Sequence, residues 1–415
     1  MSTLTPDQQH ALLVRNTQEV LPAGALLERL RDAASKSRPL RVKQGFDPTA
    51  PDIHLGHTVG LRKLRQFQDL GHQVVLIVGD YTGLVGDPSG RNKARPQVSA
   101  DELERNAATY LEQFYKVLDS RPAPPRLPVE VHRNGEWFSR MGFVDVIRLA
   151  AKLTVARLLE RDDFSERFKA AQPIGVHELF YPLMQGFDSV AIHADVELGA
   201  TEQKFNLLVG RELQTDAGQP PQIIMTLPVL PGTDGVQRMG KTLGNYIGVS
   251  ESPSQIFGKT MSLPDAAMET YWRLVTDADD AELREVERAL REGKVNPMEV
   301  KKRLARRLVT MYHGAEQGLK AQESFESQFS RREVPDDVPE WRPKAGDLKS
   351  FGIKDFLVAT GLAQSGSAAW RAVDQGAVAI DGVKVTDREH KIDPKSSFVL
   401  RVGRRMVRVK PAAGS

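Results

Sequence analysis

Two histidines three residues apart, His54 and His57, stand in the segment GFDPTAPDIHLGH, directly before a stretch with helical periodicity. Histidines at this spacing share one face of a first helical turn, which suits a metal ion. They equally suit an anion, because the free N–H groups and the dipole at a helix start attract phosphate. They could also only cap the helix or pack against it. The residue types alone leave these three alternatives open.

A glycine-rich segment, GVQRMGKTLGN (235–245), holds two further cationic side chains, Arg238 and Lys241. It follows an apolar run (222–230) that predicts a buried strand. Glycines give such a loop a mobile backbone, and two cations at this spacing can close on a triphosphate as charge moves onto the leaving group. A metal would need a third and usually a fourth protein ligand, and nothing in the sequence places another histidine beside the pair. Phosphate binding is therefore the favoured interpretation, and no metal site is predicted.

The segments on either side of the two histidines predict the secondary structure in which the histidines lie. Residues 41–46 predict a strand, residues 57–70 an amphipathic helix closed by Gly71, and residues 72–80 a buried apolar strand. A strand, a helix and a strand within roughly forty residues form a βαβ unit and imply a parallel sheet. The histidines therefore follow a strand and open a helix, where such a unit binds phosphate.

Farther along the chain the periodicity is mainly helical. The segments FVDVIRLAAKL (143–153) and ATEQKFNLLVGREL (200–213) predict helices, and so does the whole range 254–332. Residues 333–346 are Pro-rich, charged and without period, which indicates a linker. Beyond it, the pattern predicts two short helices and a hairpin that turns at Asp381-Gly382.

Composition and charge limit the class of protein. The apolar, charged and aromatic fractions are those of a globular protein, and no window approaches about 18 apolar residues, so no membrane span is predicted. The absence of cysteine excludes disulfides, thiolate zinc sites and cysteine nucleophiles, and it fits a cytoplasmic protein. Residues 342–410 hold 14 Lys and Arg against 7 Asp and Glu, whereas the rest of the chain holds 43 against 47. This basic tail indicates a polyanion such as nucleic acid, with a merely solvated tail as the alternative.

The two cationic stretches together resemble the signatures of the class I aminoacyl-tRNA synthetases. His-Ile-Gly-His appears as His54-Leu-Gly-His57, and Lys-Met-Ser-Lys-Ser appears as Arg238-Met-Gly-Lys-Thr242. The resemblance implies that these groups contact phosphates while an amino-acid carboxylate attacks the α-phosphorus of ATP. It assigns catalytic roles to His54, His57, Lys241, Arg238, Thr242 and Thr49, and ATP binding to Asp47, Gly56, Gly199, Glu202 and Met239.

Three further segments resemble the bacterial type of tyrosyl-tRNA synthetase: FDPTA, GDPSGR (86–91) and YPLMQGFD (181–188). In the last of them, Tyr181, Gln185 and Asp188 fall on one helical face, at i, i+4 and i+7. The resemblance implies that Asp188 takes the phenolic O–H of tyrosine. A site built around a substrate hydroxyl rejects phenylalanine, for which tyrosyl enzymes are themselves the standard example, so no editing domain is expected. The groups implied for the α-ammonium are Asp87, Tyr181 and Gln185, and Gln203 is implied to line the same site.

Three places depart from the family's pattern. In the second signature, Arg238 replaces the first lysine and keeps its charge on a planar guanidinium, and Gly240 and Thr242 replace two serines. Beside the ATP ribose, Ala200 and Glu202 replace a glycine and an aspartate, which adds one methyl and one methylene. Lys43 stands where some members carry a tyrosine that also contacts the substrate hydroxyl.

The resemblance covers about residues 45–410 and implies an α/β fold with a Rossmann-like parallel-sheet catalytic domain. The implied parts are a catalytic nucleotide-binding domain (1–250) that includes the signature loop 238–242, an all-α anticodon-side domain (251–332), a linker (333–349) and a small α+β RNA-binding C-terminal domain (350–411). In the last of these, Arg371, Lys384, Arg404 and Arg405 are expected to contact RNA.

By this resemblance the chain is expected to be a cytoplasmic, homodimeric tyrosine--tRNA ligase. Its expected partners are ATP, L-tyrosine and tRNA(Tyr). Mg²⁺ is expected to arrive with ATP, and no cofactor is expected to be bound tightly.

Three other classes of protein share part of the pattern. Tryptophanyl-tRNA synthetases have the fold and the signatures but normally lack the Tyr-Gln-Asp face and this kind of tail. Small nucleotidyltransferases share the histidine motif but lack the Lys241 loop followed by a helical domain. An RNA-binding paralogue without catalysis would have lost the histidines or the loop lysine, and His54, His57 and Lys241 are all present.

Overall fold

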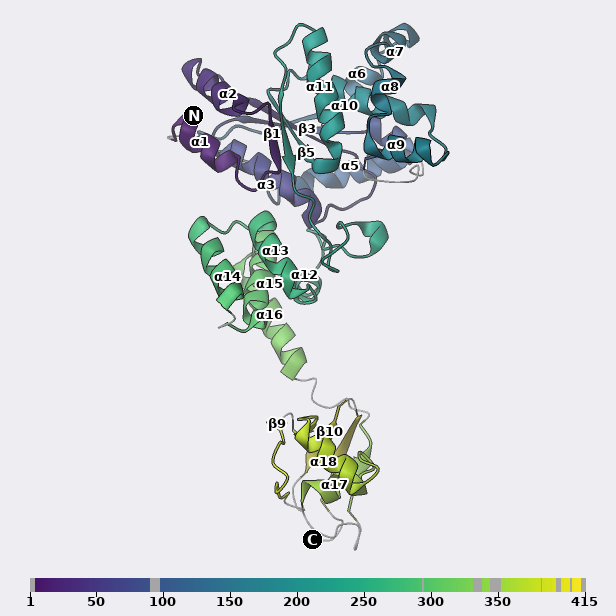
Figure 1. The fold of residues 1–415 in the computed structure, drawn as a ribbon. Helices are drawn as coiled ribbons and strands as arrows, with labels where there is room; N and C mark the ends of the chain where they lie inside the picture. The colour runs from purple at the N-terminus through teal and green to yellow at the C-terminus, as the bar shows by residue number, and fades with distance from the viewer. Residues whose placement is uncertain are drawn as a thin grey trace. The chain divides into compact units, whose positions relative to one another are not determined.

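The chain forms two units in the computed structural model, Met1–Gln322 and Glu323–Ser415. The first holds a sheet with flanking helices and then a group of helices, and the second holds the end of the last of these helices and a smaller sheet with two further helices (Figure 1). The structure describes residues 4–89, 98–292, 295–330, 338–343, 352–381, 383–392, 397–403 and 405–411.

A six-stranded sheet lies at the centre of the first unit, in the order β1-β6-β5-β2-β3-β4. Five of its strands run parallel, and β1 pairs antiparallel with β6 at one edge. The strands are β1 (Glu19–Leu21), β2 (Arg41–Phe46), β3 (Gln73–Val78), β4 (Glu130–Arg133), β5 (Val196–Ala200) and β6 (Ile223–Leu227). Strands β3 and β6 are buried along almost their whole length, as continuous apolar runs in a covered parallel sheet should be. The predicted strands at 41–46, 72–80 and 222–230 are confirmed as β2, β3 and β6.

Strand β2, helix α3 (Leu55–Asp69) and strand β3 form the predicted βαβ unit, with the two strands parallel and paired along their full length. The helix packs on both strands and buries an apolar face that includes Leu61 and Phe67. It begins two residues before the predicted start, because His54 caps it. At its far end Gly71 has a φ of +84°, which glycine adopts without strain.

The strand order reverses at β2, with β3 and β4 on one side and β5 and β6 on the other. In doubly wound sheets, ligands bind in the crevice outside the carboxyl ends of the strands at such a reversal. In this sheet that edge lies at Phe46 and Ala200, where β2 and β5 end. The predicted α/β class is confirmed. The segment that leads to His54 and His57 directly follows β2, so it starts at this edge of the sheet.

Helices pack on the sheet on the side of β5 and β6 as well. Helix α11 (Lys204–Asp216) packs on both strands, and α10 (Tyr181–Ala191) packs on α11. The helix predicted over 200–213 begins only at Lys204, because Ala200 still belongs to β5 and Thr201–Gln203 form a 3₁₀ turn (η2). The other helices of this part are α1 (Pro6–Leu13), α2 (Ala25–Ser35), α4 (Thr82–Val85), α5 (Ala100–Phe114), α6 (Gly135–Phe138), α7 (Phe143–Ala150), α8 (Val155–Leu158), α9 (Asp162–Lys169), η1 (Val176–Phe180) and η3 (Lys241–Leu243).

Helices follow one another after the sheet, and the predicted helical character of 254–332 is confirmed for the described residues of that range. Helix α13 packs on α3, which ties these helices to the sheet. They are α12 (Pro253–Met261), η4 (Asp265–Ala267), α13 (Met268–Val275), α14 (Asp280–Glu292), α15 (Pro297–His313) and α16 (Ala315–Ser330). In the described part of the chain, no helix combines the length and apolar character needed to span a bilayer.

The second unit contains a five-stranded sheet in the order β7-β11-β10-β8-β9 and the two predicted short helices. The predicted hairpin is confirmed as β8 paired antiparallel with β9, although Gly382 of its turn lies outside the described residues. Within the range predicted as a linker, β7 pairs parallel with β11. The elements are β7 (Glu340–Trp341), α17 (Ile353–Ala359), α18 (Gly366–Asp374), β8 (Val378–Ile380), β9 (Val383–Lys384), β10 (Phe398–Val402) and β11 (Arg405–Val409). The core of this unit includes Phe356, Val373 and Leu400.

Candidate active site

A cavity of about 370 Å³ opens at the carboxyl ends of β2 and β5. Both predicted signatures meet in it, although they are far apart in the sequence. The predicted residues that line it are Asp47, Thr49, His54, Gly56, His57, Asp87, Tyr181, Gly199, Glu202, Gln203, Arg238, Met239, Lys241 and Thr242. The two other residues predicted for ATP or tyrosine, Gln185 and Asp188, are not among the lining residues and share helix α10 with Tyr181.

The two histidines form a reciprocal cap at the start of α3. The Gly56 N–H donates to His54 Nδ1 at 3.2 Å, and the His54 N–H donates to His57 Nδ1 at 3.1 Å. Since each Nδ1 accepts, the ring hydrogen of the neutral form sits on Nε2, which leaves an N–H donor on each ring. The ring centroids lie 3.9 Å apart. The pair is therefore both a helix cap and two donors for an anion.

Both imidazoles are held neutral at physiological pH. Burial lowers the pKa of His54 to about 2, and the neighbouring His57, Lys241 and Arg238 lower it further because a protonated His54 would be repelled by other positive charge. Burial likewise lowers the pKa of His57 to about 4, and Lys241 adds to the effect. The neutral rings can still donate to phosphate through Nε2–H, while the two cations beside them supply positive charge.

The two signature cations reach the cavity from the loop that follows β6. Lys241 Nζ lies 3.3 Å from Asp52 Oδ2, and Arg238 Nη1 lies 2.6 Å from Glu202 Oε1. The loop backbone is held by the Gly240 N–H, which donates to the Asn245 side chain at 2.9 Å. The longer Glu202 and the forked Arg238, two departures from the family's pattern, thus pair with each other.

Asp47 joins the segment before the two histidines to helix α10. Its Oδ2 accepts the Tyr181 hydroxyl at 2.8 Å, and its Oδ1 accepts the Thr82 hydroxyl at 2.7 Å. A Cβ at Gly79 would lie 2.1 Å from Oδ1, so only glycine leaves room for this carboxylate. The sequence motif identified Asp47 and Tyr181, whereas Thr82 and Gly79 came from no motif.

Asp188 lies buried on the α10 face that the i, i+4, i+7 spacing predicted. Its Oδ1 accepts Trp137 Nε1–H at 3.0 Å, and its Oδ2 accepts Asn134 Nδ2–H at 3.4 Å. Burial raises the pKa of Asp188 to about 7, although Lys43, Trp137 and Asn134 all oppose the rise. The result is a desolvated carboxylate in a fixed orientation, which is what recognition of a single hydroxyl requires.

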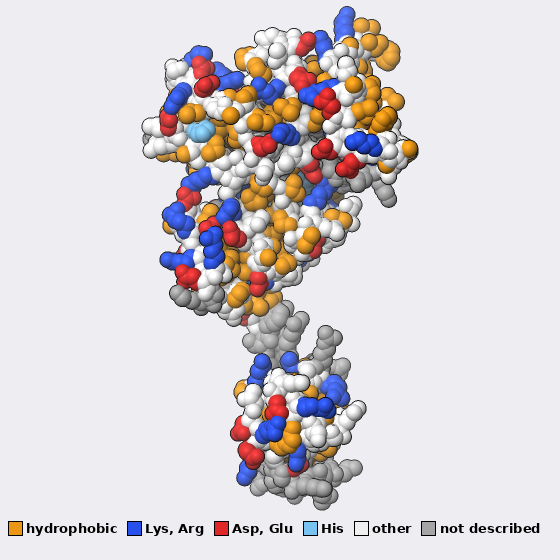
Figure 2. Space-filling model, in the orientation of Figure 1, with side chains coloured by type: hydrophobic (Ala, Val, Ile, Leu, Met, Phe, Trp, Pro, Cys, Tyr) orange, Lys and Arg blue, Asp and Glu red, His pale blue; other side chains and the backbone are white. Residues whose placement is uncertain are grey.

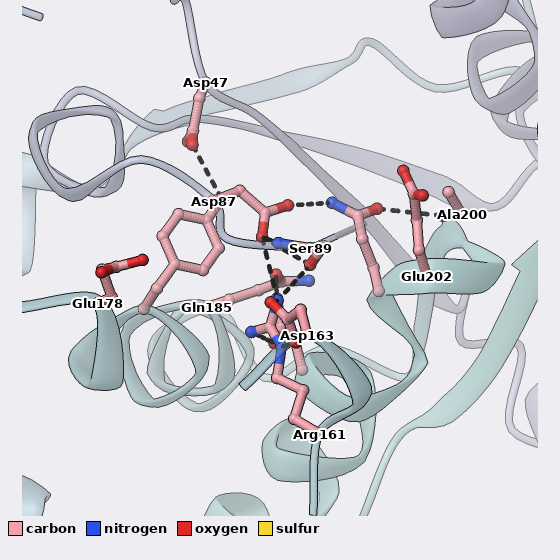
Figure 3. Close-up of polar contacts among 12 residues, drawn as sticks. Asp47, Asp87, Ser89, Arg161, Asp163, Glu178, Gln185, Ala200 and Glu202 are labelled. Carbon is pink, nitrogen blue, oxygen red and sulfur yellow. Dashed lines mark hydrogen bonds and ion pairs between the residues drawn. The ribbon is translucent and has the colours of Figure 1, made fainter. Parts of the chain in front are cut away.

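Asp87 is fixed from two sides in the part of the cavity that Figure 3 draws. Its Oδ2 accepts Gln203 Nε2–H at 3.0 Å. Its Oδ1 accepts the backbone N–H and the hydroxyl of Ser89 at 2.9 and 2.6 Å. Gln203 Oε1 in turn accepts the Ala200 N–H at 3.0 Å, so Ala200 makes this contact through its backbone.

Lys43 points into the interior beneath α10 and is fully buried. Its Nζ lies 2.9 Å from Glu197 Oε1 and donates to the Gln185 carbonyl and the Ser189 hydroxyl, both at 2.8 Å. Lys43 is thus one half of a buried ion pair. The sequence missed its partner Glu197, because a glutamate inside a strand as short as β5 gives no local signal of burial.

The predicted RNA-binding cations of the second unit are exposed where the structure describes them. These are Arg371, Lys384 and Arg405. Arg405 also donates to the Leu362 carbonyl at 2.6 Å. Arg404 lies outside the described residues.

Two family models match the chain. Residues 35–330 match the tRNA synthetases class I (W and Y), and residues 331–405 match the tyrosine--tRNA ligase SYY-like C-terminal domain. The tyrosine--tRNA ligase of Moorella thermoacetica is 50% identical over 96% of this chain and 94% of its own length. The tyrosine--tRNA ligase of Thermotoga maritima is 48% identical over 97% of each chain.

Solved structures share the fold at low sequence identity. A C-terminally truncated mitochondrial tyrosyl-tRNA synthetase of Aspergillus nidulans matches with a TM-score of 0.62 and 20% identity over 78% of this chain and 94% of its own. Tyrosyl-tRNA synthetase of Archaeoglobus fulgidus, complexed with L-tyrosine, matches with a TM-score of 0.61 and 22% identity over 77% of this chain and 100% of its own. The sequence relatives decide the family, and in this chain the two signatures meet in one cavity. The chain belongs to the class I tRNA synthetases and, within them, to the tyrosine--tRNA ligases.

Proposed function

We propose that the cavity binds ATP at the turn between β2 and α3, and L-tyrosine between α10 and the ends of β2 and β5. A tyrosine carboxylate oxygen would attack the α-phosphorus, the bond to the bridging oxygen would break, and pyrophosphate would leave. A hydroxyl at the 3′ end of tRNA(Tyr) would then take the tyrosyl group from the adenylate and release AMP. The observation that supports this most is that His54, Lys241 and Asp87 line one cavity at the strand reversal.

In the phosphate half of the cavity, His54 and His57 would donate through Nε2–H to oxygens of ATP. Donors that are fixed before the reaction stabilise charge as it develops in the transition state. Lys241 and Arg238 would exchange their carboxylate partners for the β- and γ-phosphates, since a triphosphate offers more negative charge than one carboxylate. The other residues proposed for this half are Asp47, Thr49, Gly56, Gly199, Glu202, Met239 and Thr242.

In the tyrosine half, the Asp188 carboxylate would accept the phenolic O–H. Asp87, Tyr181 and Gln185 would accept from the α-ammonium, and Gln203 would hold Asp87 in place. Each of these side chains already has a protein partner, so the site is organised before substrate enters. Preorganisation of this kind lowers the entropic cost of binding.

Asp87→Asn should raise the KM for tyrosine by about tenfold to hundredfold, because a hydrogen bond to a charged partner contributes about 1.5–3 kcal/mol. The KM for ATP should change less than twofold, since Asp87 faces the tyrosine half. Both constants come from ATP–pyrophosphate exchange. An unchanged KM for tyrosine would place the α-ammonium elsewhere and refute this half of the site.

Mg²⁺ would enter with ATP and offset the charge of its phosphates. Asp52 and Glu202, carboxylates of this cavity, each pair with a cation. Within the described ranges, no three or more His, Cys, Asp or Glu side chains gather in a way that could hold a metal ion. The residues present therefore fit an ion carried by the nucleotide better than one held by the protein.

The second unit would bind tRNA(Tyr) through the phosphate backbone, because residues 342–410 carry twice as many cationic as anionic side chains. Arg371, Lys384, Arg404 and Arg405 remain the proposed contacts. The proposed parts are the catalytic domain (1–250), the anticodon-side helical domain (251–332), the linker (333–349) and the RNA-binding domain (350–411). The proposed location is the cytoplasm, which suits a chain without cysteine.

We also propose a homodimer formed through the surface of α7, α8 and α9. Figure 2 shows hydrophobic side chains gathered over these helices. Their rim carries both signs of charge, with Arg148 beside Asp145 and Lys152 beside Asp216, so the surface is complementary to a second copy of itself. Apolar side chains that gather on one exposed surface often mark a protein–protein interface. The exposed apolar side chains here are Phe143, Val144, Ile147, Val155, Phe168 and Val176.

Phe143→Asp combined with Ile147→Asp should convert the protein to a monomer, because each carboxylate would have to be buried against apolar side chains. Sedimentation equilibrium should give the wild type twice the 46.0 kDa of one chain and the variant a single chain. Leu319→Asp on α16 is the matched control, an exposed leucine outside the α7–α9 surface, and it should leave the dimer intact. A wild type that sediments as one chain at all concentrations would contradict the proposal.

A further inference from the structure

Arg161 is a buried cation beside the tyrosine half of the cavity, with 4% of its surface exposed. It precedes α9 and donates four hydrogen bonds, and Figure 3 labels its partners Asp163 and Ser89. Two go to Asp163, from Nε to Oδ1 at 2.7 Å and from Nη2 to Oδ2 at 3.0 Å. The others go to the Ser89 hydroxyl at 2.8 Å and to Asn206 Oδ1 at 2.9 Å. The proposed mechanism uses none of these four side chains.

The first branch from Arg161 leads to Asp87. A guanidinium can only donate, so the Ser89 oxygen must accept from it. The Ser89 hydrogen is then directed at Asp87 Oδ1, 2.6 Å away. Arg161 thereby fixes the direction of the hydroxyl that holds Asp87.

The second branch leads through two amides to Gln185. Because Asn206 Oδ1 accepts from Arg161, its Nδ2 faces Gln185 Oε1 at 2.8 Å and donates to it. Gln185 Nε2 then donates to Glu197 Oε1 at 3.0 Å, and that carboxylate is paired with Lys43. Arg161, which can only donate, stands at one end of this branch, and the Glu197 carboxylate, which only accepts, stands at the other. The side-chain amides of Asn206 and Gln185 between them therefore have one allowed orientation each.

We infer that Arg161 is a positioning residue for the α-ammonium site, which it serves by fixing the hydrogen-bond direction along both branches. Asp87 and Gln185 Oε1 then both present acceptors, which is what an ammonium group needs. With the opposite amide orientation, Gln185 would turn an NH₂ group toward the ammonium. The inference rests on the proposed placement of the tyrosine α-ammonium at Asp87, Tyr181 and Gln185.

The charge of Arg161 cannot itself attract an ammonium group. Arg161 Nη2 lies 3.7 Å from Asp87 Oδ1, where a positive charge opposes a second cation. Asp163 offsets that charge at 2.7 Å. Removing Arg161 and Asp163 together therefore leaves the local net charge unchanged and tests orientation alone.

The test combines Arg161→Met with Asp163→Leu, because replacing both members of a buried pair avoids an uncompensated buried charge. The KM for tyrosine in ATP–pyrophosphate exchange should rise about tenfold to hundredfold. The inhibition constant of tyrosinol, which keeps the ammonium, should rise by the same factor. That of 3-(4-hydroxyphenyl)propanoate, which lacks the ammonium, should stay within twofold.

The neighbouring pair Arg167–Glu178 is the matched control. It is equally buried, with Arg167 Nη1 2.6 Å from Glu178 Oε2, and it has no recorded bond to Asp87, Ser89 or Asn206 among the described residues. Arg167→Met with Glu178→Leu should change the melting temperature much as the test variant does, while the KM for tyrosine stays within twofold. Ser89→Ala and Asn206→Leu test the two branches separately if the Arg161 variant does not fold.

Selective weakening of tyrosine and tyrosinol supports the inference. Equally weaker binding of all three ligands would mean that Arg161 has only a general structural role, and it would overturn the inference. Unchanged binding of all three ligands would also overturn the inference. Asp87→Asn is measured in parallel. If Asp87→Asn weakens the binding of tyrosine and the variants of Arg161, Ser89 and Asn206 do not, only the inference fails. If Asp87→Asn also has no effect on the binding of tyrosine, the proposed ammonium site fails as well.

Discussion

Asp188→Asn should lower the discrimination between tyrosine and phenylalanine by about 100-fold or more. Tyrosyl enzymes are themselves the standard example of this discrimination, at about 10⁵. The carboxylate is buried and held by Trp137 and Asn134, so phenylalanine would leave a desolvated charge without its partner. An asparagine removes that charge. Most of the free-energy cost of binding phenylalanine, which lacks the hydroxyl, is then removed as well. The measurement is kcat/KM for both amino acids in ATP–pyrophosphate exchange.

Asp195→Asn is the matched control for this substitution. Asp195 is also buried and ion-paired, with Arg29 and Arg38, but it directly precedes β5 at the amino end of that strand, away from the cavity. It should lower stability without changing the preference for tyrosine. Equal loss of discrimination in both variants would mean that Asp188 acts through general stability and does not read the hydroxyl.

The raised pKa of Asp188 adds a pH signature to the same experiment. Burial raises that pKa to about 7, so the carboxyl takes up a proton as the pH falls below 7. The KM for tyrosine should then rise by up to about tenfold per pH unit, because only the charged form is a strong acceptor. In Asp188→Asn this pH dependence should be absent.

His54→Ala should lower the kcat of tyrosine activation by about 100-fold to 1,000-fold, the usual cost of removing one preorganised donor to a transition state. Tyrosine binding measured by equilibrium dialysis should change less than twofold, since His54 faces the phosphate half. Because His54 also accepts the Gly56 N–H as a helix cap, the substitution removes two functions at once.

His54→Asn separates these two functions. Asparagine is a favoured capping residue but lacks the ring Nε2–H, so stability should be retained while kcat falls as in His54→Ala. His72→Gln is a second control, since His72 is another buried histidine with a lowered pKa but lies beyond the opposite end of α3. A kcat within tenfold of wild type in His54→Asn would contradict the proposed donor role.

Long apolar or amphipathic segments made much of the fold predictable. The unit of β2, α3 and β3, the strand β6 and the helices after residue 253 follow from hydrophobic period and helix stop signals. Strands β1, β4 and β5 were not predicted, because segments of three to five residues with mixed polarity show no hydrophobic period. Strand β5 was also hidden by the helical pattern that follows it, where the 3₁₀ turn at Thr201–Gln203 separates the two elements.

The site was predictable where its residues stand in short motifs and unpredictable where it depends on contacts across the chain. The face of Tyr181, Gln185 and Asp188 follows from helical spacing alone. Arg161 stands in the charged run ERDDF, which is typical of a solvated surface, yet the fold buries it against Ser89 and Asn206. Only the packing of α9 and α11 around the cavity reveals such partners.

The most direct test of the central claim is ATP–pyrophosphate exchange by the wild-type protein with each of the twenty amino acids. Exchange driven by tyrosine alone, followed by transfer of the tyrosyl group to tRNA(Tyr), is the predicted result. Exchange driven by tryptophan, or by phenylalanine as readily as by tyrosine, would contradict the assignment of Asp188. No exchange with any amino acid would contradict the proposed catalytic roles of His54, His57 and Lys241.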